Sequence, residues 1–213
     1  MRKLLFPLVV FALASCTSGG SAGTPDAEST ETPSEDTTQI EEAPKQESAW
    51  SVNQSDFQEA LRAAEARYDD FDEETVYLWG AGEIVEGVLF GGQLDYADSG
   101  DVEAGLGVFY SDDDWIFFDT LDVRADGSSY ELGTFESWDK LEDVGSGYVT
   151  EYGVIAPSPM LDDAFAAIVQ DRGSKFRLSG SDGSVEREFT SEERDAIRNW
   201  YTVYRGIEEG LIP

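Results

Sequence analysis

The chain has 213 residues and a formal net charge of -31, with 45 acidic side chains against 14 basic ones, no histidine and one cysteine. A surface this acidic repels phosphate backbones, which excludes nucleic-acid binding. The lack of histidine excludes Ser-His-Asp and Cys-His nucleophile systems and imidazole-based zinc or copper sites. Carboxylate chemistry, Ser–Lys chemistry and oxygen-ligated hard cations remain, and no cofactor is predicted.

The first fifteen residues have the layout of a secretory signal. Arg2 and Lys3 form a positive head, an apolar run extends from Leu4 to Leu13, and small residues follow. This order of charged, apolar and small residues is typical of an export signal. The apolar run is shorter than the roughly 20 residues that a membrane-spanning helix needs. We therefore predict a signal peptide over residues 1–15.

The single cysteine directly follows this segment. Leu13-Ala14-Ser15-Cys16 resembles the lipobox of bacterial lipoproteins. The resemblance implies cleavage after Ser15, a diacylglyceryl group on the Cys16 thiol and acylation of the new amino terminus. More than one acyl chain gives stable anchoring. The expected location is the outer face of the bacterial cytoplasmic membrane, or the outer membrane if the host has one. The alternative is an ordinary signal peptide, or a cytosolic protein, with a chance cysteine.

Residues 16–49 are predicted to form an acidic, disordered tether. They are rich in Ser, Thr, Gly, Pro, Ala and Glu, and Ile40 is their only large aliphatic residue. Such a segment cannot bury enough apolar surface to offset its ordering entropy. From about Trp50 the composition changes, and all five tryptophans and nine tyrosines lie from there on. Residues 50–213 are long enough to bury one core, so a single globular domain is predicted.

Periodicity in the first part of this domain predicts a helix followed by strands. Ser55 to Gln58 has the pattern of a capping box, and the apolar residues after it recur at helical steps. That predicted helical face consists of Phe57, Leu61, Ala64, Tyr68 and Phe71. Strands are predicted over residues 75–79, 83–96, 103–110, 115–124 and 148–156. Asp126-Gly127 predicts a hairpin that pairs Val123 with Tyr130, Leu121 with Leu132, and Phe118 with Phe135.

The second part of the domain adds two helices and a hairpin. Ser158-Pro159 is expected to start a helix with Leu161, Phe165 and Ile168 as its apolar stripe and its end at Gly173. A hairpin at Asp182-Gly183 pairs Phe176 with Phe189 and Arg177 with Glu188. Thr190 to Glu193 is a second capping box. It opens a last helix whose predicted buried face is Ile197, Trp200, Tyr204 and Ile207.

The predicted fold class is therefore α+β, a mainly antiparallel sheet of meander and hairpins with three helices, one N-terminal, one before the last hairpin and one C-terminal. This order of elements resembles other uncharacterised bacterial surface lipoproteins, and no motif fixes a family.

Glu151 is the most interesting single carboxylate. It shares a predicted strand face with Val149 and Ile155, where burial would raise the pKa of a glycosidase-type acid. Trp115 and Trp138 are candidates for stacking on sugar rings. The alternative, which we favour, is an edge-strand acid paired with an arginine. Ser137-Trp-Asp-Lys140 fits S-x-x-K by chance, because no K-T-G strand follows it.

Acidic clusters raise the possibility of calcium, an oxygen-ligated hard cation. The predicted hairpin sets Asp122 opposite Glu131, a destabilising arrangement unless a cation lies between them. The other clusters are Asp112 to Asp114, a group of Asp95, Asp98, Asp101 and Glu103, and a run of Asp69, Asp70, Asp72, Glu73 and Glu74. A solvated acidic surface is the favoured interpretation, and no metal ligand is predicted. Gly80-Ala-Gly82 and Gly105-Leu-Gly107 are interpreted as glycines at bulges or turns.

The only site residue predicted is thus Cys16, for lipid attachment, with no catalytic, cofactor-binding or metal-binding residue. The predicted function is a lipid-anchored, extracytoplasmic, non-catalytic binding, sensory or accessory module. Its expected partners are the membrane, through the anchor, and an envelope component, a solute or a neighbouring protein. The alternatives are a small secreted hydrolase with paired carboxylates, and a calcium-dependent adhesion module.

Overall fold

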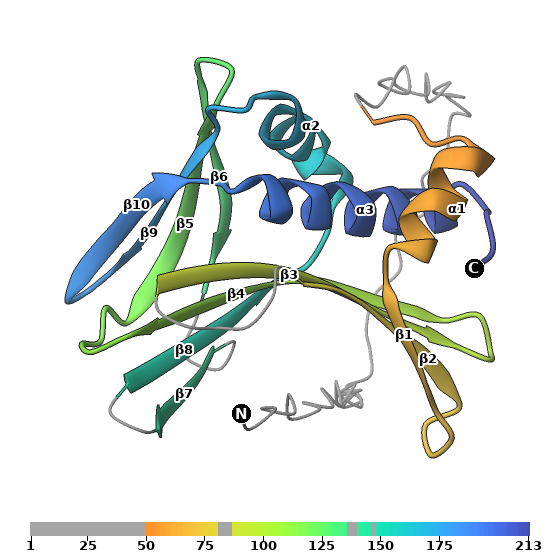
Figure 1. The fold of residues 1–213 in the computed structure, drawn as a ribbon, viewed down its shortest axis with the longest axis horizontal. Coiled ribbons are helices and arrows are strands. Elements are labelled where there is room, and N and C mark those ends of the chain that lie inside the picture. Colours follow the sequence, from red (N-terminus) through yellow and green to blue (C-terminus); the bar gives the residue numbers. More distant parts are fainter. Residues whose placement is uncertain (1–49, 81–86, 136–139, 146–147) are drawn as a thin grey trace, which may run out of the picture. The chain divides into compact units, whose positions relative to one another are not determined.

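Two antiparallel sheets and three helices make up the part of the chain that the computed structural model describes, residues 50–80, 87–135, 140–145 and 148–213 (Figure 1). These residues belong to one compact unit, Lys45–Pro213. The helices are α1 (Gln54–Arg62), α2 (Asp162–Gln170) and α3 (Ser191–Glu208), and a short 3-10 helix (Pro159–Leu161) precedes α2. The predicted α+β class with a mainly antiparallel sheet is confirmed.

The larger sheet has six strands in the order β1-β2-β3-β4-β8-β7. Its strands are β1 (Glu65–Asp69), β2 (Glu74–Gly80), β3 (Gly87–Ala97), β4 (Val102–Asp112), β8 (Tyr148–Ile155) and β7 (Lys140–Gly145). The second sheet has four strands in the order β10-β9-β5-β6. These are β10 (Gly183–Glu188), β9 (Lys175–Gly180), β5 (Phe118–Ala125) and β6 (Ser128–Thr134).

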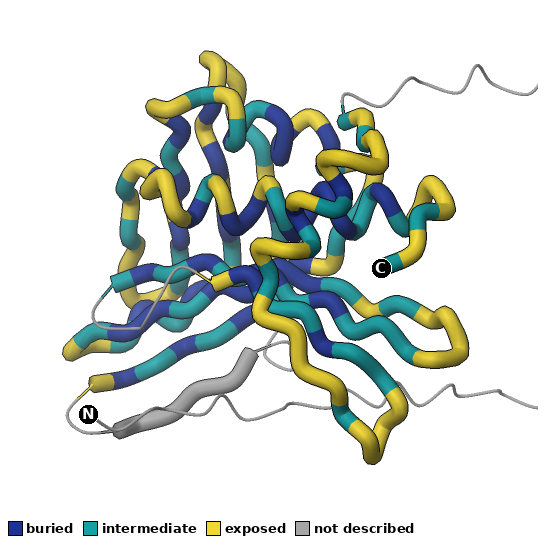
Figure 2. The backbone as a smooth tube through the Cα atoms, turned by 45° about the vertical axis from the view of Figure 1, so that its right-hand side comes forward, coloured by how far each residue is buried: buried dark blue, intermediate teal, exposed yellow. Residues whose placement is uncertain are grey.

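Helix α3 and the four-stranded sheet cover the same face of the six-stranded sheet. The indole of Trp200 on α3 lies over Gly92 of β3 and donates to the Gln93 carbonyl at 2.9 Å. Phe90, two residues before Gly92, meets the Phe176 ring of β9 with ring centroids 4.9 Å apart. Because side chains alternate across a strand, Phe90 and Gly92 point to one face, and the core lies there. Buried and less buried positions alternate along these strands in Figure 2.

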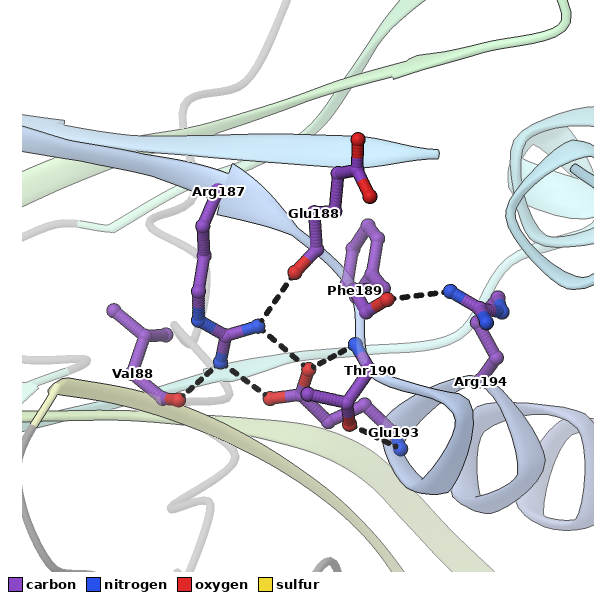
Figure 3. A network of polar contacts seen from close by, with 7 residues as sticks. All are labelled: Val88, Arg187, Glu188, Phe189, Thr190, Glu193 and Arg194. Carbon is purple, nitrogen blue, oxygen red and sulfur yellow. Dashed lines mark hydrogen bonds and ion pairs between the residues drawn. The ribbon is translucent and has the colours of Figure 1, made fainter. Parts of the chain in front are cut away.

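Arg187 on β10 joins these layers. Its guanidinium forms a bidentate pair with Glu193 of α3, at 2.7 and 2.6 Å, and also donates to the Val88 carbonyl of β3 (Figure 3). The Glu193 side chain is only 2 % exposed and also accepts from the Thr190 amide at 2.9 Å. The Thr190 hydroxyl accepts from the Glu193 amide, so the predicted capping box is present. One cap therefore fixes both the start of α3 and its place against the two sheets.

The first helix is shorter than predicted. Its N-cap is Asn53, whose Oδ1 accepts from the Ser55 and Asp56 amides at 2.9 and 3.0 Å, so the predicted cap at Ser55 is wrong. The helix ends at Arg62, and the chain turns into β1, which pairs with β2. Tyr68 and Phe71 are consequently 53 % and 92 % exposed, because strand pairing overrides the helical spacing of their apolar side chains.

The hairpin at Asp126-Gly127 forms, and its register is only partly as predicted. Val123 lies opposite Tyr130, but a bulge after Leu121 sets that residue opposite Gly133 instead of Leu132. The Phe118 and Phe135 rings still meet edge to face at 5.0 Å.

Strand β5 begins at Phe118, whereas the prediction began it at Trp115. Residues 116–118 are held by Glu151, which is described below.

The second hairpin turns one residue earlier than predicted, at Ser181-Asp182. Phe176 therefore pairs with Arg187, and Arg177 pairs with Glu186, with which it forms an ion pair at 2.6 Å. The predicted pairs with Phe189 and Glu188 are wrong by two residues, a shift that keeps every side chain on its expected face. Phe189 lies just past the strand, and its ring still contacts Phe176 at 5.2 Å.

The later helices largely follow the sequence pattern. Ser158 caps the 3-10 helix by accepting from the Met160 amide, and α2 ends at Gln170, before the predicted stop at Gly173. Phe165 and Ile168 are buried as predicted, as are Ile197 and Trp200 on α3. The structure also contains β1 and β7, which the sequence analysis did not predict.

Candidate functional site

Several predicted features lie outside the described residues. These are the signal peptide, Cys16, the tether, Gly82, and Ser137 with Trp138. Within the described residues no helix is long and apolar enough to cross a membrane.

Glu151 lies deep inside the protein. It is 0 % exposed and sits on β8, between β4 and β7. Its Oε1 accepts from the Ile116 and Phe117 amides at 2.8 and 2.9 Å, and its Oε2 accepts from the Phe118 amide at 2.8 Å. The interpretation as an edge-strand acid paired with an arginine is therefore wrong: the strand is interior and the partners are backbone N–H groups. Since solvent cannot reach the carboxylate, it positions the chain before β5 and does not face a substrate.

Among the described residues, the acidic clusters do not form a group that could hold a metal ion. Asp122 and Glu131 are opposite one another, as predicted, and both are exposed to solvent. Asp113 in the loop after β4 donates its amide to Asp112 Oδ1 at 2.7 Å. In the described ranges no three acidic side chains converge on a point that could hold a metal ion. Asp113, Asp114, Asp122 and Glu131 are exposed to solvent, whereas Asp95 and Glu74 are half-buried.

The second face of the six-stranded sheet combines acidic and apolar side chains. We call it the open face, because in Figure 1 the described helices and the four-stranded sheet lie on the other side of this sheet. Strand alternation and pairing bring its residues together from four strands. They are Glu74, Val76 and Leu78 of β2, Leu89, Gly91, Gln93 and Asp95 of β3, Glu103, Gly105, Gly107 and Phe109 of β4, and Tyr152 and Val154 of β8.

Glycines in β4 leave room for neighbouring side chains to pack directly against the backbone of the open face. A β-carbon added at Gly107 would come within 3.0 Å of Tyr152 Cε2 and 3.1 Å of Phe109 Cε2. The two rings therefore lean over Gly107, and their centroids are 4.3 Å apart. In the same way Val154 lies over Gly105, 2.4 Å from where a β-carbon would stand. The result is a half-buried apolar floor of about three side chains.

Gly105 and Gly107 were expected at a bulge or turn, and this expectation is wrong. Both sit in regular register in the interior strand β4, opposite Gln93 and Gly91. Gly80 lies at the end of β2. Trp115, a candidate for stacking on sugar rings, is half-buried, packs against the hydrophobic core and stacks on Phe117 with ring centroids 5.4 Å apart.

Carboxylates stand at one end of the open face. Burial raises the pKa of Asp95, although the Gln93 amide, which donates to both of its oxygens at 3.1 and 2.9 Å, opposes the shift; Glu103 raises it further. The pKa of Glu74 is also raised, by burial first and then by the charges of Asp95 and other acids. Neither carboxylate has a cationic partner among the described residues. Burial, and then the charge of Asp95, raise the pKa of Tyr152 to about 12, so the negative charge of Asp95 acts on the Tyr152 hydroxyl.

Sequence reasoning did not predict this face. Glu103 and Asp95 were noticed as part of an acidic cluster, but Tyr152, Phe109 and Gln93 were not singled out. The sequence signal for this face was the alternation along β4 and β8, in which every second side chain points away from the core. That alternation indicates a shared surface only once the strand order shows that β4 and β8 are neighbours.

Comparison of the chain with protein-family models, with curated proteins and with solved structures found no match.

Proposed function

We propose that the protein is a lipid-anchored, extracytoplasmic binding module whose open face binds organic cations that carry an apolar body. Cys16 would carry the lipid, residues 16–49 would hold the domain away from the membrane, and the domain would present the open face. The observation that supports this best is the joint position of Tyr152 and Asp95 on one sheet face. A positive group attracted by Asp95 can rest beside an aromatic ring.

The chemistry favours a cation over a neutral sugar. A cation within about 6 Å of an aromatic ring gains roughly 0.5–2 kcal/mol, more when water is excluded. Burial first, and then the charges of neighbouring acids, raise the pKa of Asp95 and Glu74, so part of the shift comes from repulsion among Asp95, Glu74 and Glu103. A bound positive charge would relieve it. Ligand binding and the electrostatic state of the face are thus coupled.

The binding test uses the chain from residue 16 with Cys16→Ser, so that no lipid is attached. Benzyltrimethylammonium is titrated by calorimetry, with benzyl alcohol and maltose as neutral probes. Saturable binding of the cation alone is expected. Asp95→Asn and Tyr152→Leu should each weaken it about fivefold to tenfold, since a partly exposed charge pair or cation–π contact contributes about 1 kcal/mol.

The matched control is Asp122→Asn, which removes an exposed acid from the four-stranded sheet and should leave the affinity unchanged. Equal weakening by Asp95→Asn and Asp122→Asn would mean that only the net charge attracts the probe. Binding of maltose but not of the cation would contradict the proposal and would indicate sugar recognition instead.

The anchor is tested separately in cells. Wild-type protein should fractionate with the membrane and should incorporate labelled fatty acid, whereas Cys16→Ser should be released or remain unprocessed. Mature Cys16→Ser protein that still fractionates with the membrane would refute lipidation at this residue.

A further inference from the structure

A pocket of about 480 Å³ lies between the end of α2 and the first turns of α3. Three arginines line it, Arg172 just after α2 and Arg194 and Arg198 on α3. The complete lining is Val169, Gln170, Arg172, Ser191, Arg194, Asp195 and Arg198. Three of the ten arginines of a chain with net charge -31 thus meet at one hollow.

The spacing on α3 explains part of this cluster. Arg194 and Arg198 are four residues apart, so they lie on the same side of the helix. Arg172 joins them from another element, because α2 packs beside α3. With Asp195 as the only acid of the lining, the formal charge of the lining is three positive minus one negative, or +2.

The three guanidinium groups differ in how far they are engaged. Arg198 pairs with Asp195, and Arg194 donates one N–H to the Phe189 carbonyl (Figure 3). Among the ion pairs of the described residues none includes Arg172 or Arg194, although backbone and side-chain hydrogen bonds and then the charge of Arg194 lower the pKa of the nearby Asp171 and Glu192. Because a guanidinium carries five N–H donors, Arg172 and Arg194 keep most of their hydrogen-bonding capacity for a ligand.

We infer that this pocket binds a small multivalent oxyanion, a carboxylate or phosphate compound. Planar guanidinium groups bind the paired oxygens of carboxylates and phosphates bidentately. The volume is within the range of 300–1,000 Å³ that small-molecule sites typically have. The Ser191 hydroxyl donates to Glu192 at 3.1 Å and is a further polar group at the rim. This pocket is separate from the open face. It is proposed to bind anions, whereas the open face is proposed to bind cations.

The test titrates the full chain, purified in mild detergent, with citrate and with inorganic phosphate by calorimetry at fixed ionic strength in chloride. At least one of the two anions should bind saturably, and comparison of the two affinities distinguishes carboxylate from phosphate recognition. Arg194→Gln and Arg172→Gln should each weaken binding about tenfold. The matched control is Arg62→Gln, an exposed arginine at the end of α1, which should leave the affinity unchanged.

A substitution that is expected to strengthen anion binding complements the arginine substitutions. Asp195→Asn releases Arg198 from its ion pair and removes the only acid of the lining, so binding should become several-fold tighter. Glu59→Gln, an exposed acid on α1, makes the same charge change at a distance and should have no effect. No saturable heat with either anion, or equal effects of the pocket and control variants, would overturn the inference. Thermal melts of all variants identify any that fail to fold, and Arg172→Gln, at an exposed position, then stands in for Arg194→Gln.

Discussion

Replacing Glu151 by glutamine exchanges one oxygen of a fully buried carboxylate for an NH₂ group. The carboxylate accepts from the amides of Ile116, Phe117 and Phe118. A glutamine side chain has one acceptor oxygen, which can keep the two amides on Oε1. Its NH₂ group then faces the Phe118 amide, so two donors oppose one another and one buried N–H loses its acceptor.

The magnitude follows from these contacts. A hydrogen bond to a charged group contributes about 1.5–3 kcal/mol, and an unsatisfied buried donor costs about 1–3 kcal/mol. Removing the buried charge offsets part of this, because a buried carboxylate carries a desolvation cost. We expect Glu151→Gln to lower the free energy of unfolding by about 3 kcal/mol. For a domain of this size that is a fall in Tm of about 10 °C.

The assay is urea unfolding at neutral pH, followed by tryptophan fluorescence, with hydrogen exchange of residues 116–118 as a local readout. The control is Glu131→Gln, an exposed acid on β6, which should cost nothing because it also removes the repulsion from Asp122. Faster exchange of the three amides is expected only in Glu151→Gln. If the two variants unfold at the same urea concentration, the carboxylate does not hold this segment as argued.

Three further outcomes are expected. Gly180→Ala should lower the free energy of unfolding in urea by at least about 2 kcal/mol, because its β-carbon would stand 2.2 Å from the Ile116 carbonyl oxygen, a backbone atom that cannot move without shifting the chain. Arg187→Met should lower the free energy of unfolding by about 3 kcal/mol in the same assay, since it leaves the buried Glu193 carboxylate without its cation. Burial raises the pKa of Asp95, so the folded state takes up a proton more readily than the unfolded state. Stability should therefore rise as the pH falls from neutral toward that raised pKa, and Asp95→Asn should flatten this rise in a series of thermal melts.

Local signals in the sequence were sufficient for much of the fold. Asp126-Gly127 forms the predicted turn, because both residues adopt positive φ, 48° and 75°. The Thr190 to Glu193 box depends only on residues three positions apart. The failures occurred where a distant segment decides the local structure. Residues 65–69 pair with β2 as a strand, and Glu151 binds the amides of residues 116 and 117, which lie before β5.

The candidate sites depend even more on distant segments. The open face exists because β3, β4 and β8 are neighbours, which brings Asp95 onto the same surface as Tyr152 from 57 residues away. The composition shows that the chain is rich in acidic residues, but it does not indicate which carboxylates become partly buried in the folded protein. In the arginine pocket, the spacing of Arg194 and Arg198 is visible in the sequence. The contribution of Arg172 requires the packing of α2 beside α3.

The two sites place opposite demands on the same acidic chain. At physiological salt the Debye length is about 8 Å, so a ligand responds mainly to the charges that line its site and less to the net charge of -31. Three guanidinium groups around one pocket can then attract an anion that the molecule as a whole repels. At low salt the distant acids are no longer screened, and they oppose the anion while they assist a cation approaching Asp95. Raising the salt concentration should therefore weaken cation binding at the proposed open-face site, whereas moderate salt should favour anion binding at the proposed arginine pocket by screening the surrounding carboxylates.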